Sequence, residues 1–580
     1  MLTPIPPLSD YVPASLNATD WPQLDPLYRG LINRTLDSRN TLEQLILDRS
    51  ELDAAASEAG SVLHINMTCH TDDLATRAAY MAFIENVQPR LRETGFELDK
   101  KIVNSPFVLE LDQTRYGVLL RDTKTAVELF RQENVAIETE ITKLETRYSE
   151  VCGVMTVQFR GEEKTMPQMG RYQEETDRAV REEAWRAVAA RRLQDRAVLD
   201  DIFDQLLALR HKVALNAGFA NYRDYAFRVK RRFDYTPADC DNFARGCEES
   251  VVPALRRFNA SRRTNLKLDT LRPWDLAVDP LGRAPLRPFQ QPSEMVEKTA
   301  KIFRRMDPTP GGLADMFDSL RFPPAGVSCL DLDSRKGKAP GGYQANRDRQ
   351  RVPFIFMNAA GLLRDVETMV HEAGHAFHSL LSRTDPLVSY RSDIPLEFCE
   401  VASMSMELTS YPFLDEFFNK DEADRARRVH SEQIANLLPW IATIDQFQLW
   451  MYTNIGHSRA QRAAKWLEIV KRFGAQCDWT GLEDVLESAW HRQLHLFTAP
   501  FYYIEYGIAQ LGALQMYANY KQNPVATIAQ YKRGLSLGGS RPLRELFAAA
   551  GLEFDFSPRR IAMVWGAVEK ELGDEVVPAR

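Results

Sequence analysis

The 580-residue chain has few cysteines and no long apolar run. Its seven cysteines are scattered and form no CxxC pair, a pattern that fits reduced thiols rather than a disulfide framework. No stretch of about 18 apolar residues is present, so the sequence predicts no transmembrane helix. The residues after Met1 also lack the apolar segment of a signal peptide. We therefore expect a soluble, cytoplasmic protein without a membrane partner.

The chain also lacks an excess of positive charge. Its 73 Lys and Arg residues face 80 Asp and Glu residues, which gives a formal net charge of -7. A negative net charge does not indicate a broad basic surface for nucleic acid, so we expect no nucleic-acid partner. No internal repeat or low-complexity run is present. Nothing in the composition indicates an oligomeric state.

Helical patterns dominate what is present. A length of 580 residues with 44% hydrophobic content allows one large core or two lobes. We predict a mostly α-helical fold, with an N-terminal helical lobe at 1–190 and a catalytic lobe at 191–580. The segments with the clearest helical pattern are Thr125–Tyr148, Glu174–Ala217 and Pro292–Phe303, and a hairpin is predicted at Val154–Met166.

The clearest indication of catalytic chemistry is the motif His371-Glu372-Ala373-Gly374-His375, which has the form HExxH. On a helix, residues four apart share a face, so His371 and His375 can direct two imidazoles at one metal ion. Glu372 then reaches the adjacent water as a general base. The opposite face is apolar, and no Lys or Arg occurs from Val366 to Ser382, which indicates that the histidine face lines a cleft. Asp365 is the expected N-cap.

Zinc needs a third protein ligand and an open position. His378 is a poor candidate, because it lies about 10 Å of axial rise beyond His371 on one straight helix. A second helix should therefore supply the ligand. The sequence Asp393-Ile394-Pro395 predicts the start of one, with Asp393 as N-cap and Pro395 in the first turn. This helix carries Glu397, Glu400 and Glu407 near one face. Spacing alone does not choose between Glu397 and Glu400.

A third block runs from His495 to Gly507 and is rich in hydrogen-bond donors. Tyr502 and Tyr506 are four residues apart on a helix that we expect Pro500 to open, so both hydroxyls can face one cleft with His495 on the preceding turn. Hydroxyl and imidazole donors suit an oxyanion that forms during attack on a peptide carbonyl. Gly507 and Gly512 are costly inside a helix, and close backbone packing is their expected reason.

A small sheet is predicted just before the metal helix. The segments Val327–Leu332 and Val352–Met357 read as strands, joined through the segment from Gly337 to Gln350. The edge of such a sheet can pair with an extended peptide through backbone hydrogen bonds, whatever the sequence of that peptide.

Together the three blocks resemble the thimet oligopeptidase and oligoendopeptidase F family of zinc metallopeptidases, with the oligoendopeptidase F branch the nearer one. The resemblance implies a two-lobed helical zinc peptidase with a deep substrate channel and one Zn²⁺ per chain. It implies that Glu400, 25 residues after His375, is the third zinc ligand and that Glu407 holds a ligand imidazole in its tautomer. By the same resemblance His495, Tyr502 and Tyr506 bind the oxyanion and the substrate.

The predicted function is zinc-dependent cleavage of internal bonds in short unstructured peptides. Glu372 would take a proton from the zinc-activated water and return it to the leaving amine. Two alternatives stay open. A helical zinc carboxypeptidase would use the same ligands with a cationic group for the substrate carboxylate. In the second alternative the protein is a non-catalytic helical scaffold, and the HExxH motif occurs by chance.

Overall fold

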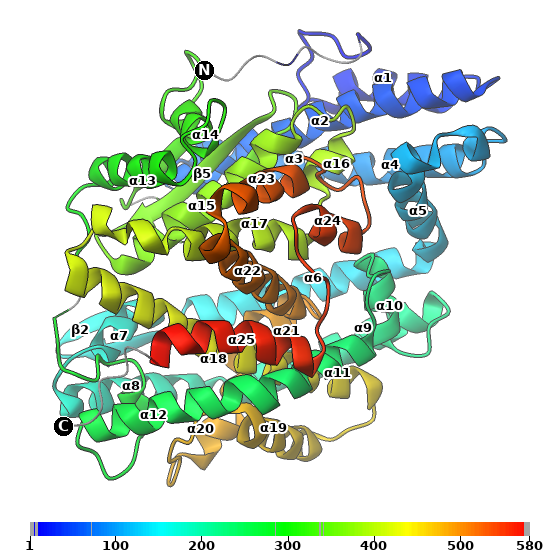
Figure 1. Ribbon diagram of the computed structural model, residues 1–580. Helices are drawn as coiled ribbons and strands as arrows, with labels where there is room; N and C mark the ends of the chain where they lie inside the picture. Colours follow the sequence, from blue (N-terminus) through cyan, green and yellow to red (C-terminus); the bar gives the residue numbers. More distant parts are fainter. Residues whose placement is uncertain are drawn as a thin grey trace. The chain divides into compact units, whose positions relative to one another are not determined.

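The computed structural model describes residue 5 and residues 10–70, 72–284, 286–335, 338–339 and 341–573. Helices dominate these residues (Figure 1), and the strands form one two-stranded and one three-stranded sheet. The predicted mostly helical fold is confirmed. In this described part of the chain, no helix is both long and apolar enough to cross a membrane.

Two compact units, each made of three separate chain segments, account for the whole protein. The first unit comprises Met1–Glu128, Leu286–Arg427 and Ala509–Phe554, and the second comprises Leu129–Pro285, Arg428–Ile508 and Asp555–Arg580. The predicted division into 1–190 and 191–580 follows chain order instead, and position 190 lies inside helix α8 (Arg178–Gln194). That lobe boundary stays a prediction.

The first unit contains the three-stranded sheet and a set of helices. Its helices are α1 (Trp21–Asn33), α2 (Arg39–Cys69), α3 (Leu74–Asn86), α4 (Gln88–Val103), α5 (Gln113–Leu129), α13 (Pro292–Met306), α14 (Leu313–Arg321), α15 (Leu363–Ser382), α16 (Val388–Ser392), α17 (Leu396–Thr409), α23 (Pro524–Leu535) and α24 (Leu543–Ala549), with short 3₁₀ turns at Val108–Glu110 and Tyr411–Glu416. Its strands are β3 (Leu330–Asp333), β4 (Tyr343–Arg347) and β5 (Val352–Ala359).

The second unit is helical apart from one hairpin. It contains α6 (Gln132–Gly153), β1 (Thr156–Phe159), β2 (Glu162–Thr165), α7 (Met166–Gly170), α8, α9 (Arg196–Asn216), α10 (Tyr222–Val229), α11 (Pro237–Gly246), α12 (Val252–Asn265), α19 (Arg459–Phe473), α20 (Glu483–Glu487), α21 (Leu494–Thr498) and α25 (Pro558–Gly573), with short 3₁₀ or π turns at Arg171–Gln173, Cys247–Val251, Pro273–Asp275 and Ala489–Arg492. Helices α18 (Lys420–Thr453) and α22 (Ile504–Gln522) begin in one unit and end in the other.

Both strands predicted beside the metal helix are present as β3 and β5, and they pair in parallel. The strand order is β3-β5-β4, so β5 is central and almost fully buried. Successive side chains of a strand point to opposite faces, and Phe354 and Phe356 of β5 pack with Ile65 and Cys69 of α2. Helix α15 also packs against β5.

Strand β4 is a feature that the sequence reading missed. It lies in the segment from Gly337 to Gln350, which was assigned to a connection and of which residues 337 and 340 lie outside the described part. The strand pairs antiparallel with β5 in the register Tyr343↔Phe356. Its residues Gln344, Asn346 and Arg347 are polar. The alternation of apolar and polar residues that indicates a half-buried strand is therefore weak here.

The hairpin predicted at Val154–Met166 is confirmed by the antiparallel pair β1 and β2. Its two turn residues, Arg160 and Gly161, both have positive φ, 53° and 82°, as a tight two-residue hairpin turn requires.

Two of the three predicted helices are interrupted. The segment Thr125–Tyr148 is divided between α5 and α6, and Glu174–Ala217 is divided between α8 and α9 at Asp195. Asp195 is the C-cap of α8 and the N-cap of α9, and its φ of -97° and ψ of 5° depart from helical values, which separates the two helices. The third helix, predicted from Pro292, is α13 and extends to Met306.

Candidate active site

Helix α15 carries the HExxH motif, and its N-terminus differs from the predicted one. The helix begins at Leu363 with Leu362 as N-cap, so Asp365 is the third residue of the helix and not its cap. The Asp365 carboxylate instead accepts hydrogen bonds from the backbone N–H groups of Ala360 (2.7 Å) and Leu362 (2.9 Å). It thereby satisfies donors near the helix start that would otherwise have no partner.

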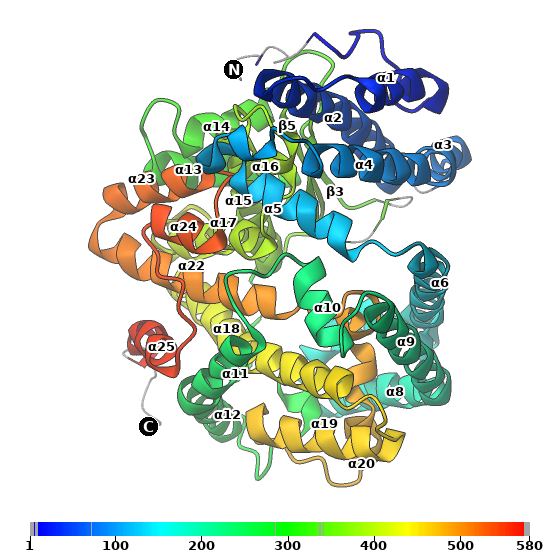
Figure 2. The same ribbon diagram turned by 90° about the vertical axis from the view of Figure 1, so that its right-hand side faces the viewer.

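Helix α17 lies directly beside α15 (Figures 1 and 2), and a glycine makes this approach possible. A Cβ atom on Gly374, between the two motif histidines, would lie 2.6 Å from both the carbonyl oxygen of Ala402 and the Cα of Ser403. Only glycine fits at that distance. The start of α17 is Leu396 with Pro395 as N-cap, so the prediction of Asp393 as N-cap was wrong; Asp393 ends α16.

Three groups that were predicted as metal ligands converge at this helix pair. The donor atoms of His371, His375 and Glu400 all lie within 4.8 Å of one another. Glu400 Oε2 is 3.4 Å from Nε2 of His371 and 3.7 Å from Nε2 of His375. The two imidazole rings stand at 82° to each other, with centroids 4.9 Å apart.

These donors fit a zinc ion chemically and in spacing. Two imidazole nitrogens and one carboxylate oxygen are a donor set that catalytic zinc sites use. In a tetrahedral site with metal–ligand distances of about 2.0–2.2 Å, ligand atoms are about 3.3–3.5 Å apart. The two measured separations from Glu400 lie close to that value, so small side-chain movements would complete the site.

Glu407 contacts the far side of the first motif histidine. Its Oε1 lies 2.5 Å from Nδ1 of His371, which leaves Nε2 of that ring directed toward Glu400. Burial alone would lower the pKa of His371, but the carboxylates of Glu407, Glu400 and Glu372 raise it to about 9. An imidazole held by a carboxylate through one nitrogen presents the other nitrogen in a fixed direction.

Glu372 is buried, and its Oε2 has no hydrogen-bond partner among the described residues. Burial raises the pKa of this carboxyl to about 7, and Glu400 and Glu407 act in the same direction while His371 opposes them. A buried carboxylate oxygen without a partner is costly unless a ligand or water completes it. Burial also lowers the pKa of His375 to about 4, so that imidazole is neutral and has a lone pair available.

His378 does not join the donor cluster. It is buried and packs edge-on against Phe398 of α17, with ring centroids 5.6 Å apart. Burial lowers its pKa to about 3, and neither ring nitrogen has a hydrogen-bond partner in the described part of the chain. His378 thus packs against α17 and is not one of the three converging donors.

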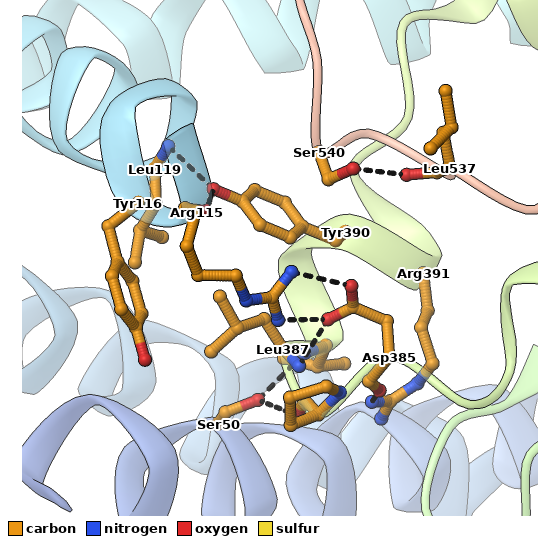
Figure 3. A network of polar contacts seen from close by, with 12 residues as sticks. Ser50, Arg115, Tyr116, Leu119, Asp385, Leu387, Tyr390, Arg391, Leu537 and Ser540 are labelled. Atoms are coloured by element: carbon orange, nitrogen blue, oxygen red, sulfur yellow. Dashed lines mark hydrogen bonds and ion pairs between the residues drawn. The ribbon is translucent and has the colours of Figure 1, made fainter. Parts of the chain in front are cut away.

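The segment between α15 and α17 is fixed to the N-terminal helices (Figure 3). Arg115 of α5 makes two hydrogen bonds to the Asp385 carboxylate, at 2.8 and 2.7 Å. Tyr390 accepts from the backbone N–H of Leu119 and donates to the carbonyl of Arg115. Ser50 of α2 binds backbone groups of the same segment. The N-terminal helices therefore hold the connection between the two donor helices.

The third sequence block lies in the second unit, and there the rings of His495, Tyr502 and Tyr506 cluster. The centroid of His495 is 5.4 Å from that of Tyr502 and 6.0 Å from that of Tyr506, and the two tyrosine rings are 5.2 Å apart. The expectation that Pro500 opens a helix carrying both tyrosines was wrong, because α22 begins at Ile504. Tyr502 precedes the helix, next to Phe501 with a φ of 62°.

Charged residues that the sequence reading did not select surround this ring cluster. Buried Glu505 pairs with Arg232 (2.8 Å) and Lys230 (3.4 Å), and the Lys230 ammonium lies 5.1 Å from the centroid of the Tyr502 ring. Arg232 also donates to the carbonyl of Phe501. The two basic residues come from a segment more than 260 positions earlier, so no local pattern reveals this contact.

Close packing is observed at the two glycines of α22, against side chains of neighbouring helices and not against another backbone. A Cβ atom on Gly507 would lie 2.7 Å from the Phe243 ring, and one on Gly512 would lie 2.8 Å from Val401. Both contacts are closer than real Cβ atoms make, so each glycine permits tight helix packing.

A mostly helical chain in which an HExxH helix packs against a glutamate-bearing helix has the fold and donor set of helical HExxH peptidases. The chain belongs to peptidase family M3. The sequence pattern of that family matches residues 171–560, and the pattern of the peptidase M3 N-terminal domain matches residues 13–130.

Individual relatives agree with this assignment. An oligoendopeptidase F homolog of Borreliella burgdorferi is 26% identical over 229 residues, which cover 37% of each chain. Oligopeptidase A of Escherichia coli is 25% identical over 287 residues, 40% of this chain and 41% of that protein. These matches therefore cover well under half the length of the curated relatives.

Solved structures match over nearly the whole chain. The structure of PZ peptidase A with an inhibitor has a TM-score of 0.86 and 26% identity, and the match covers 96% of this chain and 98% of that chain. A structure assigned as oligoendopeptidase F has a TM-score of 0.86 and 27% identity, over 98% and 99% of the two chains. The predicted family, its oligoendopeptidase F branch and its helical fold are confirmed.

Proposed function

We propose that the protein is a zinc-dependent oligoendopeptidase that hydrolyses internal bonds of short, unstructured peptides. The observation that carries the proposal is the convergence of His371, His375 and Glu400 beside a buried Glu372 whose Oε2 lacks a partner among the described residues. Membership of peptidase family M3 supports the reaction class.

In this proposal His371, His375 and Glu400 hold one zinc ion. When bound, zinc would supply Lewis-acid chemistry, lowering the pKa of water and polarising a peptide carbonyl. The Oε2 of Glu372 takes the proton of the attacking water and passes it to the leaving amine. Glu407 keeps the Nδ1–H of His371 bonded, so that Nε2 stays available for ligation.

We further propose that His495, Tyr502 and Tyr506 donate hydrogen bonds to the substrate as negative charge develops on its carbonyl oxygen. Replacing Tyr502, Tyr506 and His495 by Phe, one at a time, should lower kcat by about 10²-fold at a strong donor site, with little change in KM. The measurement is steady-state kinetics on a short peptide. Zinc content, measured in parallel, should not change. If all three variants keep the wild-type kcat, the ring cluster is structural.

Short unstructured substrates are favoured by the edge strand β4 beside the metal helix. Asn346 of β4 accepts a hydrogen bond from Ser379 of α15 at 2.7 Å, and Ser379 is one turn beyond His375. A peptide that pairs with an edge strand must be extended, which a folded protein cannot offer. The predicted deep channel would impose the same restriction and stays a prediction.

A length series tests the proposed function directly. Internal cuts are expected in peptides of roughly 5 to 20 residues, an estimate based on about 3.3 Å per extended residue and a closed cleft. Mass-spectrometric mapping of the products is the measurement, with a folded protein and its unfolded form as matched substrates. Rapid digestion of the folded protein would contradict the proposal. Release of single C-terminal residues alone would favour the carboxypeptidase alternative.

A further inference from the structure

Two residues outside the three sequence blocks make a hydrogen-bonded chain that ends on His495. Trp440 of α18 donates from Nε1 to Oε1 of Gln493 at 3.0 Å. Nε2 of Gln493 lies 2.8 Å from Nδ1 of His495. Gln493 is the N-cap of α21 and is buried, so its amide has a fixed environment.

The direction of this chain follows from the chemistry of its first member. An indole N–H is only a donor, so the Gln493 oxygen must face Trp440. The amide NH₂ then faces His495, and an NH₂ group is only a donor. Nδ1 of His495 must therefore accept, which places the ring proton of the neutral imidazole on Nε2.

The same chemistry excludes the reversed amide. Its NH₂ group would then face the indole N–H of Trp440, so two donors would meet at a contact of 3.0 Å.

We infer that Gln493, oriented by Trp440, is a positioning residue that sets the tautomer of His495 and keeps Nε2–H as its outward donor. The inference rests on the proposed function in so far as Nε2–H serves as the donor to the substrate. No group among the described residues bonds to Nε2 of His495. Its ring is flanked by Tyr502, Tyr503 and Tyr506, with no carboxylate at hydrogen-bond distance.

The charged groups that face the imidazole oppose each other. Burial lowers the pKa of His495, Lys230 lowers it further, and Glu505 raises it. The net direction is downward, so the neutral form prevails near pH 7 and its tautomer matters. A protonated ring would carry N–H on both nitrogens and would lose the hydrogen bond from the Gln493 amide.

The near-isosteric substitution Gln493→Glu tests the inference, because a carboxylate accepts and cannot donate. In this variant Nδ1–H of His495 should donate to the new carboxylate, and the neutral ring should then carry no proton on Nε2. The carboxylate also raises the pKa of His495, so at low pH the protonated ring regains Nε2–H. The ratio of variant to wild-type kcat should therefore fall as the pH rises, by about tenfold or more between pH 6 and pH 9 if the donor is strong.

Nitrogen NMR of the full-length protein with ¹⁵N-labelled histidine reads the tautomer directly, with His495→Phe identifying the signal. Wild type should show Nε2–H at pH 8, and Gln493→Glu should show Nδ1–H. Nδ1–H in the wild type, or an unchanged tautomer in the variant, overturns the inference. Trp440→Phe, which removes the orienting N–H together with one ring of the indole, should give a mixture of tautomers, and it replaces Gln493→Glu should that variant not fold.

Gln461→Glu is the matched charge control, because it adds the same charge in the same unit at an exposed position. Gln461 accepts from the backbone N–H of Ser458 in the cap of α19, a bond that Glu also makes. The ratio of the kcat of Gln461→Glu to the wild-type kcat should not change with pH. A switched tautomer in Gln493→Glu with an unchanged kcat ratio would uphold the inference and refute instead the proposed donor role of His495.

Discussion

Glu372→Gln is expected to abolish turnover while the protein keeps its zinc and its fold. The amide has nearly the same shape as the carboxyl but cannot accept a proton, and general-base catalysis contributes about 10²–10⁴-fold. We therefore expect kcat to fall at least about 100-fold on a short peptide, with zinc stoichiometry unchanged. A variant that keeps more than about a tenth of the wild-type kcat would contradict the general-base role.

The stability of the metal-free protein supplies an independent readout of the same substitution. Burial raises the pKa of Glu372 to about 7 in the folded protein, above its ordinary value of 4.5. The unfolded state therefore releases this proton more easily, and the folded state loses stability as the pH rises from about 4.5 to about 7. Glu372→Gln removes this loss, so its advantage in thermal unfolding temperature over wild type should be larger at pH 8 than at pH 5.

Glu400→Ala is expected to remove zinc from the protein. Glu400 is the carboxylate nearest to the Nε2 atoms of His371 and His375. Removing an outer partner of a metal site typically costs about 10- to 100-fold in affinity, and loss of a direct ligand should cost more. Competition with a chelator, followed by metal analysis, measures the effect.

Two carboxylates of the same helix serve as matched controls for Glu400→Ala. Glu407→Ala should weaken zinc binding by only about 10- to 100-fold, because Glu407 contacts His371 Nδ1 and not the ligand side of the ring. Glu397→Ala removes a carboxylate that is equally buried, in the first turn of α17, and should leave zinc in place. Loss of zinc in Glu397→Ala instead would show that the ligand assignment is wrong.

Much of the site could be predicted from local sequence alone. The shared face of His371 and His375 follows from helical periodicity, and α15 ends at Ser382, four residues before Pro386, which could not continue it. The strands β3 and β5 and the hairpin β1–β2 were also recognisable, because apolar alternation and turn residues are properties of a few consecutive residues.

Other features depended on contacts between separate helices and strands, some of them far apart in the chain. Spacing left Glu397 and Glu400 as equal candidates, and only the packing of α17 on α15 at Gly374 brings Glu400 to the histidines. Strand β4 is polar and forms because β5 pairs with it. The backbone at Phe501 has a positive φ that a bulky residue rarely adopts, with Gln448 and Arg232 bonded to its two backbone groups.

By itself, the sequence determined the class of chemistry: a helix with two histidines and a glutamate on one face, a second acidic helix and a donor-rich block. Those features depend on periodicities of a few residues, which are local. The tertiary structure decided which carboxylate joins the histidines, that Tyr502 precedes its helix, and that Gln493 and Trp440 reach His495. These outcomes depend on contacts between residues up to hundreds of positions apart, whose energies no local pattern contains.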